Sequence, residues 1–173
     1  GCGSWFGQAS ALEPGPSGRF FDPVHGFSVA APGGDVDADA AAPPTWQPVH
    51  VRGAVVAYRD RSGASLSMLR ECGRGDAPVS VLARQLRIGL QGSAEPALEA
   101  FSVSLRGDTG WQQLFRSVGG SEAGLVRTGT LRSGGCPYDW VLGGAGDPAR
   151  DAAFDRWWRS FERPSAGDAG ASS

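Results

Sequence analysis

The sequence predicts an α+β domain in which two amphipathic helices pack on a mainly antiparallel β-sheet. Short apolar stretches with a period of two residues occur before and after residues 78–91, where the period becomes helical. A second helical period follows at residues 147–163. The chain has 173 residues, of which 40% are hydrophobic, and this is enough for one domain with an ordinary core.

Strands are predicted in the first half of the domain. Residues 25–32 and 46–53 have the composition of short strands, and two valines alternate in the second stretch. Residues 54–72 predict a hairpin, because two apolar runs flank the turn sequence DRSG. The period of two in its second arm directs three residues to one face: Leu66, Met68 and Cys72.

The segment from Pro78 to Gln91 is predicted to be an amphipathic helix. Asp76 is expected to be its N-cap, and Gly92 is expected to end it. The apolar stripe of this helix comprises Val79, Leu82, Ala83, Leu86 and Leu90.

Strands return after this helix. Residues 99–107 alternate, with Phe101, Val103 and Leu105 on one face. Residues 111–120 fit a strand or a short helix, and we favour a strand. Residues 124–145 predict a further hairpin.

The last predicted element is a helix rich in aromatic residues. Asp147 is placed to cap it, Pro148 takes its first position, and Pro164 is expected to end it. Four aromatic residues share one face at spacings of three and four, and we interpret them as core residues: Phe154, Trp157, Trp158 and Phe161.

Composition predicts one folded domain with flexible ends. Residues 1–19 are rich in Gly, Ser and Pro and are interpreted as a linker, and residues 164–173 as a disordered tail. The single domain is therefore expected to span residues 20–163. Within it, residues 31–45 are acidic and rich in Ala, Pro and Gly, which is typical of a mobile loop.

Charge argues against a nucleic-acid partner. The formal net charge is −2, and the sixteen basic residues, all arginine, form no basic stripe. No run of about 18 apolar residues occurs, so no transmembrane helix is predicted.

Two of the three cysteines are candidates for a disulfide. Cys72 closes one predicted strand and Cys136 opens another, and both are expected on the core side. A bond between them could add roughly 4 kcal/mol of stability in the chain-entropy model. The alternative is a pair of buried free thiols, as is normal in the cytosol. We favour the disulfide, because the third cysteine, Cys2, points to an exported protein.

The start of the chain, GCGS, resembles the cleavage region of a bacterial lipoprotein precursor. That resemblance implies acylation of Cys2, and Gly3 resembles the pattern of lipoproteins sorted to the outer membrane. The expected location is the periplasmic side of that membrane, with the bilayer itself as a contact through the N-terminal lipid. Trp5 and Phe6 could contact the bilayer interface or a partner protein. The alternative is that the first residues are a cloning remnant or an arbitrary start.

The order of predicted elements resembles the PsbP/Mog1 family. Its opening strand pair is matched by Phe21, Asp22, Gly26, Phe27, Pro32 and Trp46, and its later elements by CPYDWVL and FDRWWRSF. The resemblance spans residues 20–163 and implies a fold but no active site. Members mostly act as accessory or assembly proteins that bind partners.

The sequence contains no catalytic or metal-binding motif, so no catalytic residue, metal site or cofactor is predicted. It has two histidines, His25 and His50, and a metal site would need both on adjacent strands together with a ligand such as Asp22. The near-motifs GGSEA (119–123) and GDTG (107–110) are interpreted as turns.

The expected function is that of a non-enzymatic, lipid-anchored accessory protein that binds or helps assemble other envelope components. One alternative is a small-ligand or lipid-binding domain of an envelope lipid-transport system. A second is a hydrolase with an unrecognised site.

Overall fold

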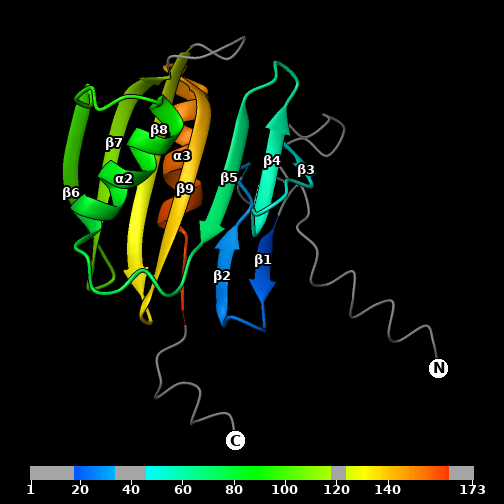
Figure 1. Cartoon of the computed structure of the whole chain (residues 1–173). Coiled ribbons are helices and arrows are strands. Elements are labelled where there is room, and N and C mark those ends of the chain that lie inside the picture. The colour runs from blue at the N-terminus through cyan, green and yellow to red at the C-terminus, as the bar shows by residue number, and fades with distance from the viewer. Residues whose placement is uncertain (1–17, 34–45, 118–123, 164–173) are drawn as a thin grey trace, which may run out of the picture.

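The computed structural model describes residues 18–33, 46–117 and 124–163. Seven strands form an antiparallel sheet in the order β3-β4-β5-β9-β8-β7-β6, and two more form a separate antiparallel hairpin, β1-β2 (Figure 1). The elements are β1 (Arg19–Asp22), β2 (Phe27–Ala30), β3 (Trp46–Val49), β4 (Val56–Asp60), β5 (Ser65–Arg70), α2 (Val79–Gln91), β6 (Glu99–Leu105), β7 (Asp108–Ser117), β8 (Gly124–Ser133), β9 (Cys136–Ala145) and α3 (Pro148–Arg159). The predicted α+β class is confirmed.

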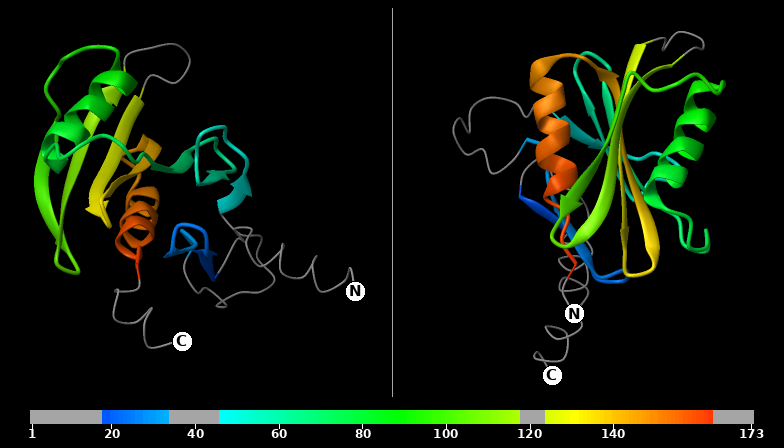
Figure 2. Two further views of the ribbon diagram at one scale, coloured as in Figure 1. Left: turned by 60° about the horizontal axis from the view of Figure 1, so that its bottom comes forward. Right: turned by 90° about the vertical axis from the view of Figure 1, so that its left-hand side faces the viewer.

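The two helices lie on opposite faces of the sheet. In the right-hand view of Figure 2 the sheet is seen nearly edge-on, with α3 in orange on one side and α2 in green on the other. The β1-β2 hairpin lies on the α3 side, where β2 contacts α3. Within the described residues, no helix combines the length and apolarity needed to cross a bilayer.

The main core lies between the sheet and α3. The aromatic residues predicted for this helix are fully or almost fully buried, and they pack on Tyr138 and Trp140 of β9. Gly129 lies directly beneath the indole of Trp158, where a Cβ atom would come within 2.8 Å of the ring. Glycine is therefore required at this position by close packing rather than by backbone conformation.

The ends of α3 are partly as predicted. The Asp147 side chain accepts a hydrogen bond from the Arg150 N–H, and Pro148 occupies the first turn. The helix ends at Arg159, before Pro164, which lies outside the described residues. Phe161 is nonetheless buried, because the chain after the helix runs along β2 through hydrogen bonds between Ser28 and Glu162.

The start of α2 differs from the prediction. Its N-cap is Pro78, without a side-chain hydrogen bond, rather than Asp76. The residue before a proline is disfavoured in helical conformation, so Ala77 cannot be helical and the helix begins after Pro78. The predicted end at Gly92 is confirmed, with a positive φ of 77°.

The antiparallel pairs of consecutive strands include β4-β5, β6-β7 and β8-β9. The first and third were predicted as such, and residues 111–117 are strand, as favoured. Leu66 and Met68 are fully buried, as expected, but Cys72 is exposed because β5 has ended at Arg70. Strand β1 includes Arg19, which was assigned to the linker from the sequence.

Candidate functional site

A groove lies on the α2 face of the sheet. The helix packs mainly on β7 and β8, to which it is held by a 2.7 Å hydrogen bond from the Gln113 side chain to the Ala83 carbonyl oxygen. The helix therefore leaves β5 and part of β9 uncovered on this face. An open hollow of about 450 Å³ lies there, with Leu69, Leu86 and Leu90 among its apolar lining.

A second hollow, of about 480 Å³, continues the groove beyond Leu90, which lines both. Its lining includes Val126, Val141 and Ser65 from three strands, and Arg59. We call the two hollows together the α2 groove. Leu90 was predicted to be a core residue, but its side chain is 43% exposed because the last turn of α2 overhangs the groove.

Asp139 lines the first hollow and is 8% exposed. It lies between Leu69 of β5 and Thr130 of β8 in the sheet register. Its Oδ1 accepts a 2.7 Å hydrogen bond from the Thr130 hydroxyl. Its pKa is raised to about 6, mainly by burial and also by the charge of Glu71, while the Thr130 hydrogen bond and the charge of Arg74 act in the opposite direction.

Arg74 connects the two walls at the Asp139 end of the groove. Its guanidinium donates to Glu71 Oε2 over 2.6 Å and also to the side-chain oxygen of Gln85 on α2. All three side chains line the hollow. The polar end of the groove therefore contains the carboxyl groups of Asp139 and Glu71, the amide of Gln85 and two arginines, Arg74 and Arg70.

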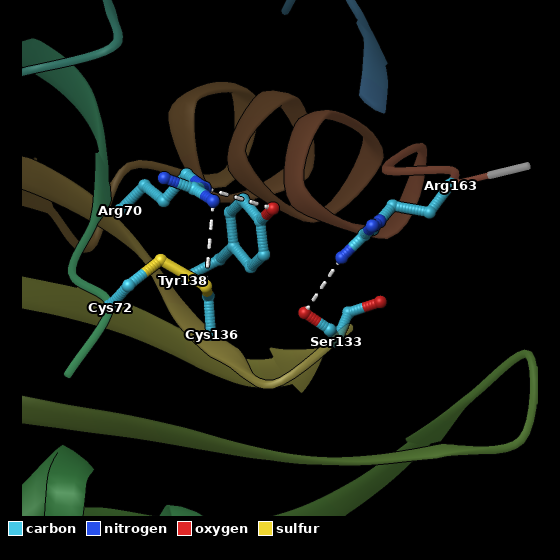
Figure 3. The surroundings of a disulfide bond; sticks show 6 residues. All are labelled: Arg70, Cys72, Ser133, Cys136, Tyr138 and Arg163. Atoms are coloured by element: carbon cyan, nitrogen blue, oxygen red, sulfur yellow. Dashed lines mark hydrogen bonds between the residues drawn. A yellow bond between two sulfur atoms is a disulfide. The ribbon is translucent and has the colours of Figure 1, made fainter. Parts of the chain in front are cut away.

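The disulfide between Cys72 and Cys136 fixes the loop that carries Glu71 and Arg74 (Figure 3). The two cysteines lie two residues beyond the last paired residues of β5 and β9, Arg70 and Tyr138, with their Cα atoms 4.6 Å apart. The predicted pairing is therefore present in the structure. The expected core-side position is correct for Cys136, which is partly buried and packs against the core, and wrong for Cys72, which is exposed.

Gly89 is the glycine of α2 that lines the groove. A Cβ atom built on it would meet no atom within 4 Å, and its φ is not positive. Glycine within a helix costs about 0.5–1 kcal/mol relative to alanine. Neither packing nor backbone conformation requires glycine here, and its absence of a side chain leaves the helix backbone accessible from the groove.

The other sites considered from sequence do not come together. His25 Nδ1 lies 2.7 Å from Asp22 Oδ2 in the β1-β2 hairpin, whereas His50 follows β3 in the other sheet. Burial alone would raise the pKa of Asp22, but hydrogen bonds from His25 and the charge of its ring lower it overall. Among the described residues, no group of three potential metal ligands is present.

The remaining predictions lie partly outside the structure. Cys2, Trp5 and Phe6 lie outside the described residues, as do the near-motif at 119–123 and most of the acidic loop. The interpretation of GDTG as a turn is correct only for its first residue: Arg106 and Gly107, both with positive φ, form the β6-β7 turn, whereas residues 108–110 belong to β7.

Sequence reasoning did not identify Asp139 or the groove. Asp139 lies between the buried Tyr138 and Trp140 in β9, so its side chain points to the opposite face of the sheet. An acidic residue in that position is typical of a strand face exposed to solvent. The available signal was the neighbouring strand, whose Thr128 and Thr130 face the same way and are fully buried. Only the placement of α2 shows that this face is covered.

Comparison with known proteins supports the fold. Neither a family model nor a curated protein matches the sequence. A solved structure of cyanobacterial PsbP (CyanoP) from Synechocystis sp. PCC 6803 is similar, with a TM-score of 0.60 and 16% identity over 86% of this chain and 94% of that chain. This domain has a PsbP-like fold.

Two weaker structural similarities were found. A protein of unknown function from Pseudomonas aeruginosa has a TM-score of 0.49 at 14% identity, over 69% of this chain and 99% of that chain. A protein from Bacteroides thetaiotaomicron also has a TM-score of 0.49, at 13% identity, over 88% of this chain and 50% of that chain. The PsbP-like assignment depends on the first comparison.

Proposed function

We propose that this protein is a non-enzymatic accessory domain of the bacterial cell envelope, anchored by lipid on Cys2, that binds another envelope protein in the α2 groove. The groove is the observation that carries the proposal. It is open, it combines leucine side chains with charged groups, and Leu90 is exposed between its two hollows. Protein-binding surfaces commonly combine an apolar centre with a polar rim.

The lining of the groove favours binding over catalysis. The first hollow contains one acid with a raised pKa, Asp139. The other acid there, Glu71, is exposed and paired with Arg74. A hydrolase with a nucleophile would need that group and a base within hydrogen-bonding distance of each other. The lining of the first hollow includes no Ser, Cys or His, and the lining of the second includes serines but no His, Asp or Glu that could act as the base. Hydrolysis remains the second alternative.

A protein partner is favoured over a lipid. The space between the sheet and α3 is filled by aromatic side chains, and Trp157 and Trp158 are fully buried there. The hollows of the α2 groove are open and partly polar, whereas lipid-binding cavities enclose most of the ligand in apolar surface. The lipid-binding alternative therefore has less support.

The proposed location rests on the cysteines. Disulfides persist in oxidising compartments such as the bacterial periplasm, and the bond between Cys72 and Cys136 supports export. The lipid anchor rests on the GCGS sequence at Cys2. Labelled palmitate should enter the wild-type protein in its native host and should not enter the Cys2→Ser variant. Equal labelling of both proteins would contradict the anchor.

Groove binding can be tested by filling the groove. We expect Gly89→Trp to place an indole in the groove without a clash in the domain, because a Cβ atom there has no neighbour within 4 Å. Gly89→Ala is the matched control. After crosslinking and purification from membranes, an envelope protein recovered with the wild type and Gly89→Ala should be lost with Gly89→Trp. Equal recovery with all three would contradict docking in the groove.

A further inference from the structure

We propose that the α2 groove binds a lysine side chain of the partner protein, with the ammonium group on Asp139 and the aliphatic part along Leu86 and Leu90. This inference rests on the proposed function of the groove. Four features of the described residues support it. They are the open acceptor position on the Asp139 carboxyl group, the lack of a basic side chain within 4 Å of it, the hydrogen bond from Thr130 to one of its oxygens, and the size of the groove.

The first feature is the acceptor itself. Oδ1 of Asp139 accepts the hydrogen bond from the Thr130 hydroxyl, and among the described residues this is the one hydrogen bond of the carboxyl group. Asp139 is more than nine-tenths buried and lies in the wall of the hollow. A buried carboxylate is stabilised by a hydrogen-bonded cation, and one of its oxygens is available for that contact.

The second feature is the absence of an internal counter-ion. No basic side chain of the described residues lies within 4 Å of the Asp139 carboxyl group. Arg74 is hydrogen-bonded to Glu71 and Gln85. Arg70 donates to the hydroxyl of Tyr138 and to a sulfur of the disulfide (Figure 3). The charge of Arg74 lowers the pKa of Asp139 without an ion pair between the two side chains, so the contact position on the carboxyl group is open to a cation from a binding partner.

The third feature distinguishes lysine from arginine. A guanidinium group binds a carboxylate best through two parallel hydrogen bonds, one to each oxygen. Thr130 already donates to Oδ1 of Asp139, so a guanidinium that bound both oxygens would have to share Oδ1 with the Thr130 hydroxyl. A compact ammonium group, which acts as a point charge, fits this geometry better. The leucine side chains beside Asp139 suit the four-carbon stem of a lysine.

The fourth feature indicates a polypeptide rather than a free amine. The two hollows of about 450 and 480 Å³ share Leu90 and together exceed the size of one amine-bearing side chain. Gly89 allows another backbone to approach the helix closely. This chain contains no lysine, so a second copy cannot supply the side chain. The occupant is an extended segment of a different protein.

Binding should strengthen as the pH rises through the pKa of Asp139, which is about 6. The charged groups that act on Asp139 are Glu71 and Arg74, both from the loop before α2. The α2 residues that line this hollow, Gln85, Leu86, Gly89 and Leu90, carry no charge. The carboxylate is therefore the group that sets the pH dependence.

The test uses the full oxidised chain and three capped pentapeptides: Ala-Ala-Lys-Ala-Ala and its arginine and norleucine analogues. The carboxyl carbon of Asp139 is followed by NMR. At saturation, the lysine peptide should lower the pKa of Asp139 from about 6 to about 5 or below, because an ammonium group lies against it. It should bind about fivefold more tightly than the norleucine peptide, or more. About fivefold is the discrimination that the strongest exposed ion pairs provide.

Two variants separate charge from folding. Asp139→Asn keeps an oxygen for the Thr130 hydrogen bond and should abolish the preference for lysine over norleucine. Glu162→Gln, at an exposed acid outside the groove beside β2, is the matched control and should retain it. Equal binding of the lysine and norleucine peptides would overturn the inference. So would a preference that persists in Asp139→Asn, or no shift of the Asp139 signal at about 10 mM lysine peptide.

The inference and the proposed function can fail separately. If Gly89→Trp abolishes recovery of the envelope partner and Asp139→Asn leaves recovery unchanged, the groove is the docking site but lysine recognition is refuted. If Gly89→Trp leaves recovery of the envelope partner unchanged, docking in the groove is refuted, and lysine recognition there is refuted with it.

Discussion

Replacing Asp139 by asparagine is expected to change how the stability of the domain depends on pH. In the folded state burial raises the pKa of this carboxyl group from the ordinary value of 3.8 to about 6. Between these two pH values the unfolded chain has released its proton and the folded chain still holds it. The free energy of unfolding therefore falls as pH rises through this window.

The size of the effect follows from the pKa difference. Each unit corresponds to about 1.36 kcal/mol, so ionisation of Asp139 costs the folded state roughly 3 kcal/mol once the pH is well above 6. Asparagine carries no charge and retains an acceptor for Thr130. The stability of Asp139→Asn relative to the wild type should therefore increase by roughly 3 kcal/mol between pH 4 and pH 8.

Urea unfolding of both proteins from pH 4 to pH 8, at constant ionic strength, measures this difference. Comparing the two proteins cancels the titration of Asp22 and Asp60. Burial alone would raise the pKa of Asp60, but hydrogen bonds from Ser62 and Ala64 and the charge of Arg150 lower it overall. A difference that does not vary with pH, or that falls as pH rises, would refute the assignment of a buried carboxyl group with a raised pKa.

Three further predictions concern the fold. Cys72→Ser should lower the free energy of unfolding by about 4 kcal/mol, and the wild type should lose the same amount in a strong reductant; equal stability of the two oxidised proteins would contradict this. Gly129→Ala should cost about 1–3 kcal/mol in urea unfolding, because the new Cβ atom would collide with the indole of Trp158; an unchanged midpoint would show that Trp158 can move aside. Gly89→Ala should instead add about 0.5–1 kcal/mol, and destabilisation would show that packing at Gly89 is tight.

Most of the secondary structure could be predicted from the sequence, because its signals are local. The last helix has both a capping residue, Asp147, and a proline at its first position, and these fixed its start correctly. The predicted start of α2 was wrong, because Asp76 is a good capping residue when the following residues are not considered. The conformational restriction that Pro78 imposes on Ala77 outweighs it.

The candidate site could not be predicted, because it depends on contacts between distant segments. Asp139 has the sequence context of a surface residue, and it becomes buried only because α2, some fifty residues earlier, lies over that face. Leu90 fits the apolar stripe of α2, yet it is exposed because the helix packs on β7 and β8 and leaves β5 open. The choice of strands beneath a helix is a tertiary property, and hydrophobic periodicity does not specify it.

Photocrosslinking from inside the α2 groove tests the central claim most directly. A photoreactive phenylalanine analogue is introduced at position 89 in the full-length lipidated protein, and at Ala152, an exposed position on α3, as the control. In cells, the analogue in the groove should form a crosslink to a defined envelope protein that is not formed from the α3 face. Equal or stronger crosslinking from α3, or none from the groove while the protein remains at the membrane, would contradict the account.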